Sequence, residues 1–128
     1  MIDHIGFAIS NMERSKTFYV DALKPLGIGV LMEVSAEQTG ADAHAGFGKD
    51  DKAFFWIGTG HRPRGGTHVA FIAQTRAEVD SFYRAALAAG GQDNGAPGSR
   101  PYYHPSYYGA FVFDPDGNNI EAVCHRPE

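Results

Sequence analysis

Large hydrophobic residues alternate with small or polar ones at the start of the chain, and then change to a helical spacing. From Asp3 to Ile9 they occupy every second position, which predicts a strand with one buried face. Between Asn11 and Pro25 they recur along one face of a helix. Asn11 is a suitable N-cap, and Pro25 cannot continue a helix. The chain is therefore expected to open with a strand and an amphipathic helix.

The same order returns in the second half of the chain. Thr67–Ala73 is again an alternating segment, and a capping box from Thr75 to Glu78 opens the next helix, which ends at Gly90–Gly91. The expected buried stripes are Ser15, Phe18, Tyr19, Ala22 and Leu23 on the first helix, and Val79, Phe82, Tyr83, Ala86 and Leu87 on the second.

Residues 3–27 align with residues 67–91 without a gap. The matched positions carry histidine, aromatic or small side chains: His4 with His68, Phe7 with Phe71, Phe18 with Phe82, Tyr19 with Tyr83, Ala22 with Ala86, Leu23 with Leu87 and Gly27 with Gly91. So long a repeat leaves room for two copies of one module, not for a solenoid. The alternative is a chance match between two ordinary strand–helix units.

Further strands are expected after the first helix. Strand-like runs lie near Ile28–Val34, Ala45–Gly48 and Ala53–Ile57, and the polar loop Ser35–His44 separates the first two runs. The glycine-rich segment Thr59–Gly66 then connects the two modules. The first module is thus predicted to contain one helix and several strands.

The second module is expected to end in a hairpin. Ala110–Phe113 and Asn119–Val123 are strand-like, and Asp114–Gly117 supplies the turn chemistry of aspartate, proline and glycine. Before this hairpin, Gln92–Ser106 is rich in glycine and proline, and we expect a long loop with at most one short strand.

Composition limits the possible functions. The 128 residues fit one domain spanning residues 1–128, and 43% of them are hydrophobic. A net charge of −4 with scattered basic residues argues against nucleic-acid binding. The single cysteine, Cys124, excludes an intramolecular disulfide. Because no signal-like or membrane-spanning apolar run is present, a cytoplasmic location without a membrane partner is expected.

Three residues with metal-binding side chains lie on the polar faces of predicted strands. His4 and His68 are opposite the large apolar residues of their strands, and Glu121 is opposite Ile120 and Ala122. A carboxylate in that position is either solvated or held by a cation. Two imidazoles and one carboxylate suit Fe, Mn, Ni, Co or Zn. The alternative is that the histidines bond to the backbone and the glutamate faces water.

The module order and several segments resemble a known family. The paired βαβββ units, the openings DHIGFAI and THVAFIA, and the closing DPDGNNIEAV are similar to the vicinal oxygen chelate superfamily. This superfamily includes glyoxalase I, extradiol dioxygenases, fosfomycin and bleomycin resistance proteins, and methylmalonyl-CoA epimerase. The resemblance implies an α+β fold in which two modules, 1–58 and 67–128, form a curved, mostly antiparallel metal-binding cup.

The resemblance also implies a site and an activity. His4, His68 and Glu121 fall on metal-ligand positions of the family, and a homodimer is expected. The first hypothesis is a lyase- or isomerase-type enzyme that acts on a small substrate with vicinal oxygens through a metal-stabilised enediolate. The second is an Fe(II) extradiol-type dioxygenase. The third is a protein without catalytic activity that binds an antibiotic or a metabolite.

The sequence departs from the family at two positions. Trp56 stands where glyoxalase I-type members carry a fourth, carboxylate ligand, and tryptophan offers no lone pair to a metal. It is expected to line the substrate pocket or to pack in the core. Phe111 stands where the dioxygenases carry a tyrosine. The chain therefore lacks one expected residue for the glyoxalase I reaction and one for the dioxygenase reaction.

The segment Arg100–Tyr108 offers groups that could compensate. Arg100 could clamp a carboxylate or a phosphate, and His104 could act as a general acid or base, so that His104 and Glu121 are the predicted catalytic residues. The predicted substrate-binding residues are Trp56, Arg100, Tyr102, Tyr107, Tyr108 and Phe111. The alternative is an aromatic loop packed over the sheet or in a dimer interface.

Overall fold

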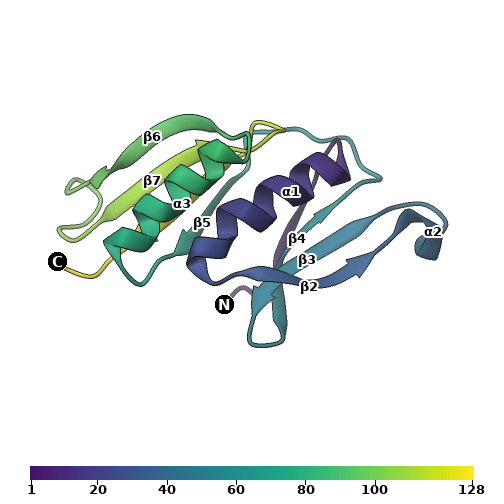
Figure 1. Cartoon of the computed structure of the whole chain (residues 1–128), viewed down its shortest axis with the longest axis horizontal. Coiled ribbons are helices and arrows are strands. Elements are labelled where there is room, and N and C mark those ends of the chain that lie inside the picture. Colours follow the sequence, from purple (N-terminus) through teal and green to yellow (C-terminus); the bar gives the residue numbers. More distant parts are fainter.

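Each half of the chain folds into its own four-stranded mixed sheet, as seen in a computed structural model that describes residues 1–128. The first half contains β1 (Ile5–Ala8), α1 (Met12–Leu23), the short 3-10 helix η1 (Lys24–Leu26), β2 (Gly29–Val34), α2 (Ala36–Thr39), β3 (His44–Lys49) and β4 (Lys52–Gly58). The second half contains β5 (His68–Ile72), α3 (Arg76–Ala88), β6 (Gln92–Ser99), β7 (Tyr108–Phe113) and β8 (Asn119–Cys124). Figure 1 shows the two halves side by side.

The two sheets have the same topology. Their strand orders are β1-β4-β3-β2 and β5-β8-β7-β6, and in each the first strand pairs in parallel with the last while the other pairs are antiparallel. This is one βαβββ unit repeated, so the predicted α+β fold of two tandem modules is confirmed. The sheets remain two separate, open sheets.

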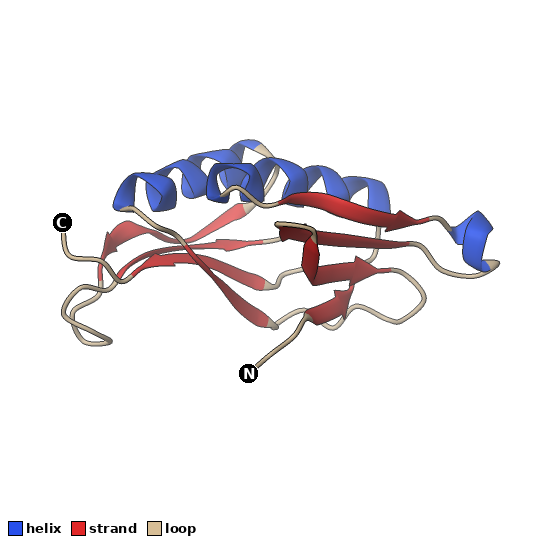
Figure 2. Ribbon diagram, turned by 90° about the horizontal axis from the view of Figure 1, so that it is seen from below, coloured by secondary structure: helices blue, strands red, loops and turns tan.

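Both long helices cover the same side of the sheets, and the opposite side carries no helix (Figure 2). The predicted caps form, because Asn11 accepts a hydrogen bond from the Arg14 backbone N–H and Thr75 accepts one from that of Glu78. Most residues of the predicted stripes belong to a core of 22 buried residues, whereas Tyr83 and Leu87 are only partly buried and pack against it. Within this core Phe55 of the first module meets Phe71 of the second edge to face, at 5.2 Å between ring centroids.

Two predicted loops contain regular structure. Most of Gln92–Ser106 was expected to be irregular, but its first eight residues form β6, an edge strand whose pairing with β7 is interrupted at Gly95 and Gly98. An edge position tolerates the glycines and the proline that suggested a loop, because an edge strand needs partners on one side only. The other predicted loop contains the single-turn helix α2. A capping box formed by Ser35 and Gln38 stabilises the N-terminus of this helix.

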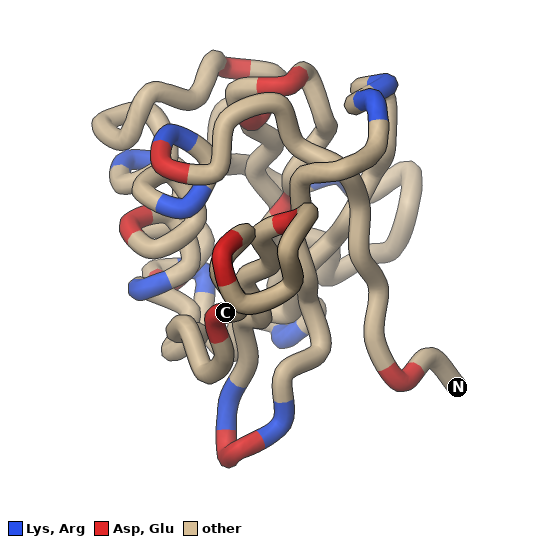
Figure 3. Tube along the Cα trace, turned by 90° about the vertical axis from the view of Figure 1, so that its right-hand side faces the viewer, with Lys and Arg blue, Asp and Glu red and all other residues tan.

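The β3–β4 hairpin has a tight turn formed by acidic residues. Asp50 and Asp51 have φ of 50° and 64°, and Lys49 pairs with Lys52 across the turn. The hairpin projects at the bottom of Figure 3, where its acidic tip lies between basic arms. Elsewhere in that view basic and acidic residues are interspersed along the chain. None of the helices combines the length and the apolar character that crossing a membrane requires.

Candidate functional site

The side of the sheets that carries no helix, called the open face below, holds most of the predicted site residues. Phe55 and Ile57 of β4 belong to the core, so Trp56 between them projects to the open face. The same alternation on β8 directs Glu121 away from Ile120 and Ala122. The predicted placement of Glu121 opposite Ile120 and Ala122 is confirmed, and Trp56, for which the sequence left both the pocket and the core open, lies on the open face.

Glu121 is buried although it lies on the open face. Its side chain is 1% exposed, and its two carboxylate oxygens accept hydrogen bonds from His68 Nε2, at 2.9 Å, and from the Tyr107 hydroxyl. Burial and the bond to Glu121 raise the pKa of Tyr107, which therefore stays a neutral donor. A buried carboxylate needs such partners, since an unpaired one would be strongly destabilising.

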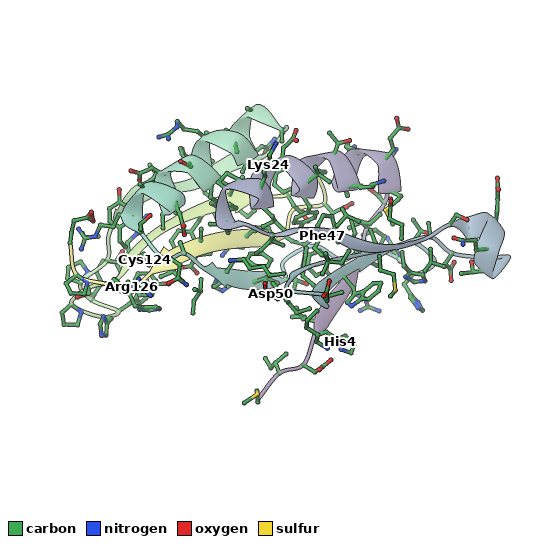
Figure 4. The ribbon with its side chains drawn as sticks, turned by 60° about the horizontal axis from the view of Figure 1, so that its bottom comes forward. His4, Lys24, Phe47, Asp50, Cys124 and Arg126 are labelled. Atoms are coloured by element: carbon green, nitrogen blue, oxygen red, sulfur yellow. The ribbon has the colours of Figure 1, made fainter.

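His4 is separate from this pair. It lies just before β1, where its Nδ1 is 2.6 Å from Asp3 Oδ2, and the ammonium of Lys52 binds the same carboxylate at 2.7 and 2.8 Å. Hydrogen bonds from His4 and Lys52 lower the pKa of Asp3. Figure 4 shows His4 where the N-terminal tail enters β1, apart from Cys124 at the end of β8. His4 and His68 do line one pocket, of ≈ 550 Å³, together with apolar residues such as Ile5 and Ile72.

The donors predicted for a metal are thus only partly assembled in one chain. No group of three or more His, Cys, Asp or Glu side chains is arranged to hold a metal ion. The chain does bring His68 and Glu121 into contact, and an imidazole beside a carboxylate is a donor pair that Zn, Fe, Mn, Ni and Co accept. This half of the expected site fits a divalent metal, and His4 as a third ligand stays a prediction.

Aromatic rings extend outward from Glu121 over the open face. Phe111, which pairs with Glu121 across β7 and β8, lies beside the His68 ring at 6.3 Å. Tyr107 is 5.1 Å from Tyr103, whose ring meets Tyr102 at 4.7 Å. The chain of aromatic contacts therefore runs from Tyr107, beside Glu121, out to Tyr102, which is 74% exposed.

Arg100 and Tyr108 are engaged elsewhere. The Arg100 guanidinium donates to the carbonyl oxygens of Ala96, Gly98 and Gly109 and stacks on Phe111 at 5.4 Å. These bonds hold the irregular β6 edge, so the predicted clamp role would have to use its remaining donors. Tyr108 lies on the helix side of β7, where its hydroxyl donates to Asp80 at 2.7 Å. That bond raises the pKa of Tyr108 and directs its phenol away from the open face.

His104 lies near the site without reaching Glu121. Its ring packs edge to face on His125 at 5.6 Å, and His125 in turn meets Tyr107 at 5.2 Å. His104 Nδ1 accepts a hydrogen bond from the Ser106 backbone N–H at 3.1 Å, so a neutral ring carries its proton on Nε2. In this tautomer the His104 Nε2–H is a hydrogen-bond donor, and the ring has no free nitrogen lone pair to act as a base, so the acid–base role stays a prediction.

Trp56 forms a wall on the first sheet. Its ring lies over Gly46, where a Cβ atom would come within 2.8 Å of ring carbons. Beside it is a pocket of ≈ 440 Å³ whose lining includes Arg62 and Arg64 of the connector. Sequence reasoning treated this segment as a linker and missed both arginines. The available signal was the pair of arginines around Pro63 in a glycine-rich segment without acidic residues.

Comparisons with known proteins identify similar families and structures. The family model described as Glyoxalase/Bleomycin resistance protein/Dioxygenase superfamily matches residues 1–122. A glyoxalase/bleomycin resistance protein from Albidiferax ferrireducens T118 is 30% identical, with a TM-score of 0.77 and 98% of each chain covered. No curated protein gave a significant sequence match.

Two further structures share the fold at lower identity. An E144Q mutant of glyoxalase I from Zea mays has a TM-score of 0.73 at 21% identity, over 95% of this chain and 46% of the maize chain. A glyoxalase-related enzyme from Fulvimarina pelagi has a TM-score of 0.69 at 18% identity, over 97% of this chain and 87% of the other.

Proposed function

The chain belongs to the Glyoxalase/Bleomycin resistance protein/Dioxygenase superfamily, and from that premise we propose that it is a metal-dependent enzyme of lyase or isomerase type. Its substrate is a small molecule with vicinal oxygens. The observation that carries the proposal is the buried Glu121 carboxylate held between His68 and Tyr107 on the open face. Burying a carboxylate at that position has a cost that core packing alone does not explain.

His68, Glu121 and His4 are the proposed metal ligands. A divalent transition metal, when bound, supplies Lewis-acid polarisation of a substrate carbonyl. Tyr107 fixes the orientation of the Glu121 carboxylate through its hydroxyl, as residues behind metal ligands commonly do. Phe111 and Trp56 offer flat apolar walls on the open face, and His104 offers its Nε2–H as a hydrogen-bond donor to the substrate.

We infer that His4 acts on a second copy of the chain. One chain contains two of the three donors in contact, and its His4 is 58% exposed at the surface. Large apolar side chains near His4 are also exposed, among them Ile2, Ile5 and Ile72. Association of two copies through this surface would bury these residues and bring His4 of one copy to the His68–Glu121 pair of the other.

The test is the metal content of protein purified without chelators. We expect about one equivalent of transition metal per chain in the wild type, by the stoichiometry of a three-ligand site. The His4→Ala/Glu121→Ala variant should lose it. A matched His61→Ala/Glu37→Ala variant removes the same two functional groups from exposed positions and should keep the metal. Bound nickel, zinc or cobalt with isomerase or lyase turnover supports the proposal, whereas iron with oxygen consumption on catechols favours the dioxygenase.

A metal-free binding protein is the second candidate. The Glu121 carboxylate already has two hydrogen-bond partners, so the pair is satisfied without a cation. The binding-protein hypothesis is supported if the wild-type protein contains no metal and takes up none of Fe(II), Mn(II), Ni(II), Co(II) or Zn(II). That result would overturn the enzyme proposal.

A further inference from the structure

We propose that the connector Thr59–Gly66 and the open face of the first sheet form a binding site for a small anionic molecule. The molecule carries a carboxylate or a phosphate on a flat, apolar group. The site contains neither His68 nor Glu121, and Trp56 is the one residue that it shares with the proposed substrate site, so anion binding here requires neither the metal nor the proposed reaction.

The charge of the pocket is the first observation. Its ≈ 440 Å³ is within the usual range for small ligands. Arg62, Arg64, His44 and His61 are among its 13 lining residues, and none of the 13 is acidic. The whole chain has 15 acidic and 11 basic residues, so a pocket without carboxylates departs from the average surface. Such a lining attracts anions.

The two guanidinium groups are free to act on a ligand. Arg62 and Arg64 are exposed, and neither takes part in the five ion pairs of the chain. Two carboxylates of this region lie outside the pocket lining: that of Asp42 is beside Gly60, and that of Asp116 accepts hydrogen bonds from the Ser10 backbone N–H. A guanidinium fork binds a carboxylate or a phosphate through two parallel hydrogen bonds.

The connector is fixed at both ends. At its start the Thr59 backbone N–H donates to the Ala43 carbonyl at 2.9 Å, and the Thr59 hydroxyl accepts from the Ala43 N–H at 3.0 Å. At its end the Gly66 N–H donates to the Gly117 carbonyl at 3.2 Å. Gly65 and Gly66 both have positive φ, which lets the chain turn tightly onto the β7–β8 hairpin. Fixed ends reduce the ordering cost of binding.

The Trp56 wall of the pocket indicates what the uncharged part of the ligand is. Trp56 lies flat over Gly46, and its Cβ atom is 3.1 Å from where a Cβ on Gly6 would be, so the glycines leave room for the indole. The ring is only partly buried, and Trp56 lines the same pocket as the two arginines. An exposed indole face favours stacking with a planar apolar group. Together these features specify a flat molecule with one anionic end.

Trp56 is the only tryptophan of the chain, so its fluorescence reports on this pocket. The protein is titrated with phenyl phosphate and with benzoate, and with benzyl alcohol as the neutral analogue. The buffer contains a chelator that removes any metal. We expect the anionic probes to change the Trp56 fluorescence, and we expect their binding to weaken as salt is added. Arg62→Gln/Arg64→Gln should weaken their binding by about tenfold or more, the scale of a lost charge-assisted contact. The ratio of the two affinities separates phosphate from carboxylate recognition.

The matched control is Arg14→Gln/Arg84→Gln, which removes the same charge from exposed positions on α1 and α3 and should bind like the wild type. Calorimetry repeats each titration independently of the fluorophore. Equal binding of benzyl alcohol, equal weakening in both double variants, or no binding of either anion by both methods would overturn the proposal. A metal-free protein that binds the probes would support it even if the enzyme proposal failed.

Discussion

At the residue scale, one buried hydrogen-bond network joins the two modules. The Tyr19 hydroxyl on α1 donates to Asp114, which begins the β7–β8 turn. Asp114 also accepts bonds from the backbone N–H groups of Asp116 and Asn118, at 2.9 and 2.8 Å, and from the Asn118 side chain at 2.9 Å. The aspartate of the DPDG turn therefore stabilises the turn and also ties it to the first helix.

This network predicts how stability changes at alkaline pH. Burial, and then the Asp114 carboxylate, raise the pKa of Tyr19. Stability carried by the protonated phenol is complete below the unfolded-state pKa of about 10 and is lost as the pH rises further. Tyr19→Phe should cost about 1–3 kcal/mol at pH 8, because Asp114 loses a partner. Its unfolding free energy should then fall less steeply than that of the wild type between pH 8 and pH 11.

Urea unfolding at both pH values measures this difference. Tyr102→Phe removes an exposed hydroxyl that makes no hydrogen bond within the chain. This variant should unfold like the wild type at pH 8. Parallel losses of stability in Tyr19→Phe and in the wild type would show that Tyr19 does not carry the alkaline effect.

At the element scale, hydrophobic spacing located the two long helices and most strands, but neither α2 nor β6. Each predicted helix rests on its own caps and its own apolar stripe, which are local features. β6 pairs only through β7 and is bent at glycines, so its formation depends on a partner distant in the sequence. Gln92–Ser99 looks like a loop for this reason, although it is paired as a strand.

The β3–β4 hairpin gives a prediction at the same scale. Two central residues with positive φ define a turn that favours Asn-Gly, whereas the chain has Asp50–Asp51. Asp50→Asn/Asp51→Gly should raise the free energy of unfolding by about 0.5–1 kcal/mol, because left-handed backbone is unfavourable for aspartate. Thermal unfolding tests this, with Asp50→Ala/Asp51→Ala as the control that should lower the melting temperature. A lower melting temperature in the Asn-Gly variant would contradict the turn assignment.

At the scale of the whole molecule, both modules contribute residues of the proposed sites to the open face. The His68–Glu121 pair lies on the second sheet, and Trp56 and the arginine pocket lie on the first. His4 lines a pocket with His68 but bonds to Asp3. Association of two chains would complete the proposed metal site with His4 of one chain and the His68–Glu121 pair of the other.

Mixing variants tests this arrangement. In co-expressed His4→Ala and Glu121→Ala chains, half of the dimers are mixed, and each mixed dimer has one complete site if His4 acts on the partner. We therefore expect about a quarter of the wild-type metal content in the mixture and none in either variant alone. Absence of metal in the mixture, with metal in the wild type, would show that His4 acts within its own chain.

The sequence alone determined the two modules, the helix caps, and the face of the strand on which Glu121 projects. These follow from spacing and capping, which act over a few neighbouring residues. Only the tertiary structure decided which side chains meet. It paired His68 with Glu121 and Tyr107, engaged Arg100 with backbone carbonyls, turned Tyr108 to the helices, and gathered Arg62 and Arg64 beside Trp56. Such contacts depend on strand register and on the paths of loops, which link residues far apart in the chain.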